Sequence, residues 1–167
     1  MKIIKLTNGY EAFIDDSDFD KINKYKWYGN GNGTDLIYAK RKTRKSEGRK
    51  EKLTTMHRQI MNYPDGKHVD HRNHNGLDNR RCNLRICTNT ENMFNRRRLN
   101  SKSGFLGVTW FKRLKKWRAS IHLTIGYFDS KEEAAKAYDQ AARKLFGEFA
   151  NLNFKNNETR CDEHNNK

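Results

Sequence analysis

Apolar residues in the first third of the chain fall in short runs divided by turn residues, a pattern that favours strands over long helices. Residues 1–14 predict two short strands around the Asn8-Gly9 turn. The glycine-rich stretch Gly29–Gly33 predicts a flexible loop. Other elements expected before Pro64 are strands at Leu36–Lys40 and Lys52–Met56 and short helices at Phe19–Lys24 and His57–Asn62.

The middle of the chain predicts a strand, a loop, a return strand and a helix, in that order. An asparagine- and glycine-rich stretch separates two short apolar runs. Thr88 and Glu91 have the spacing of a capping box, which marks the start of a helix. The expected elements are a strand ending at Val69-Asp70-His71, a loop at Asn73–Asn79, a return strand at Leu84–Cys87 and a helix from Asn89 to Arg98.

The last third of the chain predicts three antiparallel strands followed by one long helix. The strands are expected at Phe105–Phe111, Trp117–Leu123 and Thr124–Phe128. Ser130 and Glu133 have the spacing of a second capping box, and Gly147 stands where a glycine often ends a helix, so the helix should span Lys131–Phe146. Its expected apolar face is Ala134, Ala135, Tyr138, Ala141, Ala142 and Leu145.

Composition points to a basic protein with small cores. The chain has 167 residues, of which only 34% are hydrophobic, and a formal net charge of +15. Such a surplus favours a polyanionic partner, with a basic protein of the ribosomal kind as the alternative. No apolar run is long enough to cross a membrane, so no membrane partner is expected. The three cysteines include no C-x-x-C pair, so no structural zinc is expected.

Two stretches concentrate the positive charge. From Lys40 to Lys52 there are eight Lys or Arg and two Glu, which indicates either a solvated loop or an arm that contacts phosphates. From Arg96 to Arg118 there are nine Lys or Arg and no acidic residue, with aromatic residues interleaved. The polar start of this second stretch lacks apolar periodicity, which predicts a boundary between two domains.

A carboxylate, an imidazole and several amides stand close together between residues 67 and 95. Oxygen ligands of this kind suit a hard divalent metal ion, and a histidine with a near-neutral pKa suits proton transfer from water. Asp70 and His71 are neighbours, and neighbours in a regular strand point to opposite faces. Both can therefore serve one phosphate only if the strand ends or bends at this pair.

The run VDHRNHNGLDNRRCNLRICTNTEN resembles the HNH endonuclease family, specifically its phage-type homing branch. The resemblance implies a ββα-metal core in which Asp70 and Asn92 hold Mg²⁺ or Mn²⁺. It also implies that His71 is the general base and that Asn83 orients the His71 ring by a hydrogen bond. The third motif position is Asn92 rather than a histidine, a variation that occurs within the family.

Two further predictions concern residues around this motif. His57 precedes an apolar helix face, where a histidine is either structural or catalytic. Guanidinium groups bind phosphate through paired hydrogen bonds, so phosphate contacts are predicted at Arg80, Arg81, Arg85, Arg96 and Arg97.

The C-terminal run resembles the AP2 DNA-binding domain, at positions that include Gly107-Val108, Gly126-Tyr127-Phe128 and Leu152-Asn153-Phe154. The resemblance implies a three-stranded sheet on one helix, with the sheet entering the major groove of DNA. Several base-reading arginines of the plant family fall here on Leu106, Thr109 and Phe111, so the plant recognition sequence is not implied. The predicted groove-facing residues are Thr109, Phe111, Arg113, Lys115, Arg118, Ser120 and His122.

These features predict an α+β protein of two domains. The expected segments are an HNH domain over 1–97 with its ββα-metal core at about 67–97, a basic linker over 98–103, an AP2-like three-stranded antiparallel sheet packed on one helix over 104–154, and a disordered tail over 155–167.

The predicted function is metal-dependent endonucleolytic cleavage of double-stranded DNA, with one strand nicked, by a phage or mobile-element enzyme in the cytoplasm. The alternative is a non-catalytic AP2-type transcriptional regulator. RNA binding is disfavoured because the predicted sheet lacks the paired aromatic strands of RNA-binding sheets. No obligate protein partner is evident, and a monomer or weak dimer is expected.

Overall fold

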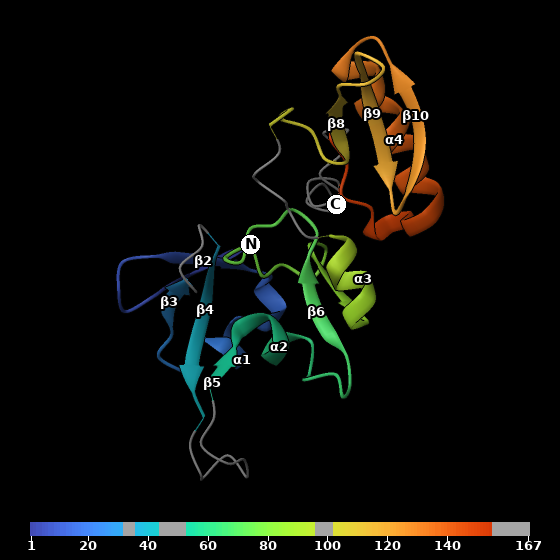
Figure 1. Ribbon diagram of the computed structural model, residues 1–167. Coiled ribbons are helices and arrows are strands. Elements are labelled where there is room, and N and C mark those ends of the chain that lie inside the picture. Colours follow the sequence, from blue (N-terminus) through green and yellow to red (C-terminus); the bar gives the residue numbers. More distant parts are fainter. Residues whose placement is uncertain (32–35, 44–52, 96–101, 155–167) are drawn as a thin grey trace, which may run out of the picture. The chain divides into compact units, whose positions relative to one another are not determined.

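The computed structural model describes two compact units of α+β architecture (Figure 1). One consists of residues 1–89 and the other of residues 90–154, and each is described by itself. No helix in the part of the chain that the structure describes is long and apolar enough to cross a membrane. The described residues are 1–31, 36–43, 53–95 and 102–154.

The division between the two units falls near the start of the helix that was expected from Asn89 to Arg98. Residues 90–95, which the sequence assigns to the first domain, group with the second unit. Arg96, Arg97, most of the predicted linker 98–103 and the predicted tail 155–167 lie outside the described residues. The linker and the tail therefore stay predictions.

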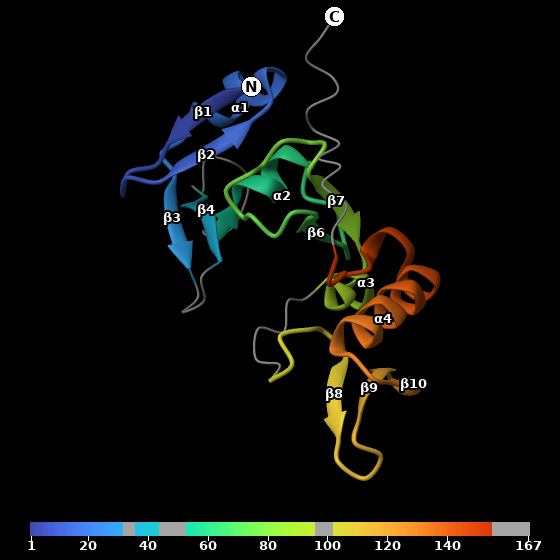
Figure 2. The same cartoon turned by 90° about the horizontal axis from the view of Figure 1, so that it is seen from above.

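The first unit begins with the predicted hairpin of β1 (Lys2–Lys5) and β2 (Glu11–Ile14), which pair antiparallel (Figure 2). A short 3-10 turn and helix α1 (Phe19–Ile22) follow. Trp27 is 1% exposed, so it is a core residue. The other buried apolar residues of this core are Ile4, Leu6, Ala12, Ile14, Ile22, Ala39, Met56, Ile60 and Leu84.

A three-stranded antiparallel sheet of β3 (Tyr28–Gly31), β4 (Ile37–Lys42) and β5 (Leu53–Thr55) packs beside this hairpin. The prediction of a loop at Gly29–Gly33 is wrong for its first three residues, which belong to β3. The Asn8 side chain accepts from Gly29 N and donates to Gly29 O, both at 2.8 Å. A Cβ on Gly29 would lie 2.5 Å from the Tyr10 ring, so glycine lets the strand approach closely here.

Helix α2 (Met56–Ile60) leads into a two-stranded hairpin of β6 (His68–His71) and β7 (Leu84–Cys87), close to the predicted bounds. The loop between these strands is bonded to β2. Phe13 N donates to Leu77 O and Asn79 N donates to Phe13 O, each at 2.8 Å. The first strands of the chain thus support the loop of the predicted nuclease motif.

The second unit contains α3 (Asn89–Phe94), whose last five residues group with it, and the predicted sheet and helix. Strands β8 (Val108–Phe111), β9 (Lys116–Ile121) and β10 (Leu123–Phe128) are antiparallel, and α4 (Lys131–Phe146) packs on them. Both bonds of the Ser130–Glu133 capping box are present. Leu145 is 63% exposed, so its placement on the buried face was wrong, whereas Ala134, Ala135 and Ala142 are fully buried.

Candidate functional site

Strand β6 ends at His71. The strand therefore ends at the Asp70-His71 pair, as it must if both side chains are to serve one phosphate. Asp70 lies opposite Arg85 in the hairpin, and His71 lies opposite Leu84. Directly after the strand, Arg72 N donates to Asn83 O at 2.9 Å, which turns the chain into the loop. Asp70 and His71 are therefore the last two residues of the strand, directly before irregular backbone.

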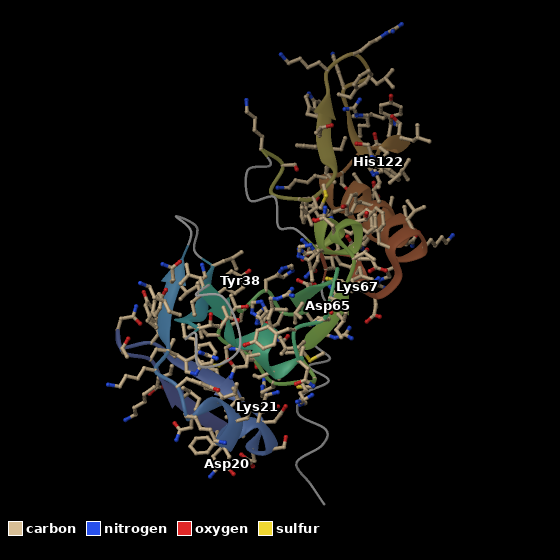
Figure 3. All side chains as sticks on the ribbon, turned by 90° about the horizontal axis from the view of Figure 1, so that it is seen from below. Asp20, Lys21, Tyr38, Asp65, Lys67 and His122 are labelled. Atoms are coloured by element: carbon tan, nitrogen blue, oxygen red, sulfur yellow. The ribbon has the colours of Figure 1, made fainter. Side chains whose placement is uncertain are left out.

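Three rings meet at the inner side of this strand end. His57 from α2 and His71 from β6 contact each other edge to face, with centroids 4.8 Å apart. The Tyr38 ring, which projects from β4, lies 5.7 Å from His57 and 5.6 Å from His71 (Figure 3). Burial and the charge of Asp70 raise the pKa of Tyr38, which keeps its phenol neutral. Residues from three separate elements therefore fix the surroundings of His71.

The His71 imidazole also has a hydrogen-bond partner in the loop. Its Nε2 lies 3.4 Å from Oδ1 of Asn79, a residue with no exposed surface. The amide of Asn79 is oriented by its own Nδ2, which donates to Leu77 O at 3.1 Å, so the oxygen is the atom that faces His71. This arrangement favours the tautomer with the proton on Nε2 and the lone pair on Nδ1.

Burial lowers the pKa of His71, although the bond to Asn79 and the charges of Asp70 and Asp78 oppose that shift. The neutral imidazole is therefore the favoured form near neutral pH, and only the neutral form can accept a proton.

His57 is a buried histidine, and only one of its two ring nitrogens has a hydrogen-bond partner. Its Nε2 lies 3.0 Å from Thr55 Oγ1, while its Nδ1 is buried without a hydrogen-bond partner. Burial, followed by the charges of His71, Arg58 and Lys40, lowers the pKa of His57 well below its usual range. Its neutral ring is fixed by Thr55 on one side and by His71 on the other.

The predicted orienting residue, Asn83, has a different set of partners. Its Oδ1 accepts from Asn73 N at 3.0 Å, and its Nδ2 donates to Asp78 O at 2.7 Å. These bonds brace the two ends of the loop, whereas the amide oxygen beside the His71 ring belongs to Asn79. Sequence reasoning missed Asn79 because the loop holds several asparagines and their order alone does not show which one turns inward.

Gly76 lies at the closest approach of this loop to the sheet. A Cβ on Gly76 would lie 2.4 Å from Ile37 O and 2.6 Å from the Tyr38 ring. Any side chain here would have to displace β4 or the ring beside His71. The glycine in the middle of the motif therefore has a packing role next to the site.

The predicted donors for a metal ion are the carboxylate of Asp70 and the amide oxygen of Asn92, and oxygen donors of this kind suit Mg²⁺ or Mn²⁺. Oδ2 of Asp70 accepts from Arg85 Nε at 2.9 Å and from Arg85 Nη2 at 2.7 Å, which fixes the plane of the carboxylate. Asn92 lies on α3, in the other unit. Among the described residues, no group of three or more His, Cys, Asp or Glu side chains could hold a metal.

Three of the arginines predicted to contact phosphates, Arg80, Arg81 and Arg85, have carboxylate partners within the fold. Arg80 pairs with Asp78 through two bonds of 2.8 Å, and Arg85 pairs with Asp70. Arg81 pairs with the buried Asp18 at 2.7 and 2.8 Å. Their roles toward DNA stay predictions.

The predicted groove-facing residues of the second unit lie on its sheet and turns. Register places Thr109, Arg118 and Tyr127 side by side across the three strands, on the face away from α4. Trp117 is partly buried and packs against the core formed by Val108, Ala119, Ala134 and Ala135. Phe111 and Ser120 lie on the same outward face, whereas Arg113 and Lys115 lie in the turn between β8 and β9. His122, labelled in Figure 3, lies in the turn between β9 and β10.

Comparison with known proteins supports the nuclease motif. A family model described as HNH endonuclease matches residues 62–94. The chain is 30% identical over 153 residues to an uncharacterized HNH endonuclease of Acanthamoeba polyphaga mimivirus, a match that covers 85% of this chain and 74% of the viral protein. No solved structure matches the chain.

Part of the chain is also similar to plant proteins. Dehydration-responsive element-binding protein 2A of Arabidopsis thaliana is 36% identical over 61 residues, which is 33% of this chain and 18% of the plant protein. Dehydration-responsive element-binding protein 2D of the same plant is 46% identical over 44 residues, covering 26% of this chain and 21% of that protein. Each of these matches is thus confined to a short segment of the plant protein.

Proposed function

Because the chain belongs to the HNH endonuclease family, we propose that it is a metal-dependent endonuclease that nicks double-stranded DNA with His71 as the general base. Family membership itself makes the chain a DNA-cleaving hydrolase. The proposal adds the residue that takes the proton, the need for a divalent ion and the cutting of one strand.

The pairing of His71 Nε2 with Asn79 Oδ1 is the observation that carries the proposal. With the proton on Nε2, the lone pair on Nδ1 can accept a proton from a water molecule. As that water attacks phosphorus, a phosphorus–oxygen bond forms, the proton passes to Nδ1, and the bond to the 3′ oxygen breaks. Tyr38 and His57 keep the ring in one orientation during this transfer, which limits the reorganisation that the reaction requires.

Asp70 and Asn92 would hold the divalent ion, whose chemistry is to stabilise negative charge that develops on the phosphate and the leaving oxygen. Arg85 contributes indirectly, because its two bonds to Oδ2 hold the Asp70 carboxylate in place. A single Asp70-His71 motif per chain supports cutting of one strand by a monomer.

The second unit would bind the DNA near the cut. Its outward sheet face carries Thr109, Phe111, Arg118 and Ser120, and its AP2-like run supports major-groove binding. Arg113, Lys115 and His122 would reach the DNA from the turns, and Arg80, Arg81, Arg85, Arg96 and Arg97 remain candidates for phosphate contacts.

A supercoiled-plasmid assay tests the proposal. The full chain with Mg²⁺ is expected to convert supercoiled DNA to open circles, and EDTA or His71→Ala should stop the conversion. His68→Ala is the matched control, since His68 is an exposed histidine on the same strand and should leave cutting intact. Equal cutting by His71→Ala would reject His71 as the base. Retained DNA binding without any cutting by the wild type would favour the regulator instead.

A further inference from the structure

We propose that the outward sheet face of the second unit recognises the C5-methyl group of a thymine in the major groove, and that Phe111 makes this contact. The inference rests on the proposed DNA binding and adds the chemical group that the sheet reads. It concerns a position where this chain has a phenyl ring and no hydrogen-bonding side chain.

The direction of Phe111 follows from strand register. Val108 and Ala119 are paired and buried under α4, so the residues that alternate with them face away from the helix. Phe111 is paired with Lys116, and Thr109 is paired with Arg118. The outward face therefore consists of Thr109, Phe111, Lys116, Arg118, Ser120, Thr124 and Tyr127.

An aromatic and basic cluster occupies the middle of this outward face. The Phe111 and Tyr127 rings lie 5.2 Å apart between centroids, with an angle of 47° between their planes. The Arg118 guanidinium lies 5.7 Å from the Phe111 centroid, and its Nε is buried without a hydrogen-bond partner. Tyr127 is 39% exposed, so the cluster forms part of the surface rather than the core.

The charge of this surface indicates a polyanion as its occupant. Lys116 and Arg118 are cationic, and none of the seven outward residues is acidic, although Lys116 pairs with the exposed Asp129 after β10 at 3.1 Å. Lys112, Arg113 and Lys115 stand in the adjoining turn between β8 and β9. An apolar patch framed by cations in this way fits DNA better than it fits an ordinary protein surface.

The methyl group follows from the chemistry of the bases. In the major groove each base presents hydrogen-bond donors or acceptors, and thymine alone among the four also presents a methyl group. A phenyl ring makes no base-specific hydrogen bond, but it can remove this methyl group from water. Transfer of one such group is worth about a fourfold change in affinity.

The test uses the full chain carrying His71→Ala, so that bound DNA stays intact. Duplexes enriched from a random pool by this protein are prepared with thymine or with uracil, which lacks only the methyl group. We expect the uracil duplex to bind about fourfold more weakly for each buried methyl group that it lacks. Adding Phe111→Ala should abolish the difference between the two duplexes, while Phe111→Leu, which keeps an apolar side chain, should retain it.

Leu123→Ala is the matched control, because Leu123 is an apolar residue of the same sheet that is 80% exposed and lies outside the outward face. It should preserve the preference for thymine. Equal affinity of the parent protein for both duplexes would overturn the inference but leave DNA binding standing. An undiminished preference in Phe111→Ala would overturn the role of Phe111, and failure to enrich any duplex would overturn both the inference and the proposed DNA binding.

Discussion

The imidazole of His57 meets that of His71 edge to face, with the two planes at 88°. His57 belongs to α2 and His71 to the end of β6, so the contact ties a helix to the strand that carries the candidate base. Thr55 fixes the other side of His57. The sequence left His57 open between a structural and a catalytic role, and this contact supports the proposal that His57 positions His71.

Replacing His57 should slow cleavage more than it weakens DNA binding. In His57→Ala the His71 ring loses its neighbour, and misplacement of a catalytic group lowers rates by about 10- to 100-fold. His57→Phe keeps an aromatic edge and should recover part of the rate. Single-turnover cleavage and DNA affinity, measured side by side, check this. Loss of affinity equal to the loss of rate would instead indicate general unfolding.

Asn79→Ala should damage both the site and the stability of the first unit. The change removes the acceptor beside His71 Nε2 and the donor to Leu77 O. Leaving buried polar groups unpaired costs about 1–3 kcal/mol. Thermal unfolding and plasmid cleavage measure the two effects. Asn75→Ala serves as the comparison, because Asn75 is an exposed asparagine of the same loop, and a larger effect there would contradict the role given to Asn79.

The stability of the first unit should fall as the pH drops below the ordinary histidine value of 6.5. Burial lowers the pKa of His57 in the folded chain, so the unfolded chain binds a proton in this range and the folded chain does not. The free energy of unfolding then decreases by up to about 1.4 kcal/mol per pH unit until the folded pKa is reached. Chemical denaturation across this range measures the slope.

His57→Gln provides the control for that slope, since glutamine does not titrate. The decline in stability should become shallower in this variant, with His71 supplying what remains, because burial lowers its pKa as well. An identical slope in both proteins would show that His57 does not carry the effect.

Arg81→Ala should lower stability because it leaves the carboxylate of Asp18 buried without its guanidinium partner. Asp18 is 3% exposed, whereas the Arg81 side chain is 48% exposed, so solvent screens part of the interaction. The expected loss is about 1–2 kcal/mol. Thermal unfolding gives this value. The salt dependence of DNA affinity separately tests the predicted phosphate contact, since removing one such contact lowers the slope by about 0.9.

Asp139→Ala should destabilise the second unit. Its buried carboxylate accepts from Asn153 N at 2.8 Å, Asn153 Nδ2 at 3.1 Å and Phe154 N at 2.8 Å. Removing these acceptors should cost about 2–4 kcal/mol, because the donors become unpaired. Calorimetry of the full chain should show a lower transition for this unit, and Gln140→Ala, at an exposed position of the same helix, should leave it unchanged.

Local patterns predicted most of the elements, since turn residues, capping boxes and apolar spacing are short-range signals. The helix Lys131–Phe146 has its predicted bounds because both of its ends carry sequence signals. The strand Tyr28–Gly31 was missed because Gly29 makes a tertiary contact with Tyr10, which no local pattern reveals.

The candidate site was only partly predictable for the same reason. The pair Asp70-His71 stands out in the sequence, and the resemblance to a nuclease family points to it. The partners of His71 come from β4, α2 and the loop, so Tyr38, His57 and Asn79 could be grouped only by the fold. The ion pairs of the arginines were also hidden from the sequence. The carboxylate partners of Arg81 and Arg85 are distant in sequence, so only the fold brings each pair together.

The bonds from Phe13 to the loop at Leu77 and Asn79 limit how the nuclease motif can be moved between proteins. The segment that matches the family model starts at residue 62, yet the backbone that holds Asn79 against His71 is anchored to β2. A transplanted or shortened segment would lose that anchor. A segment transferred to another protein would therefore have to begin at the first hairpin to keep these bonds. Recombination within residues 14–62 would separate the motif from β2.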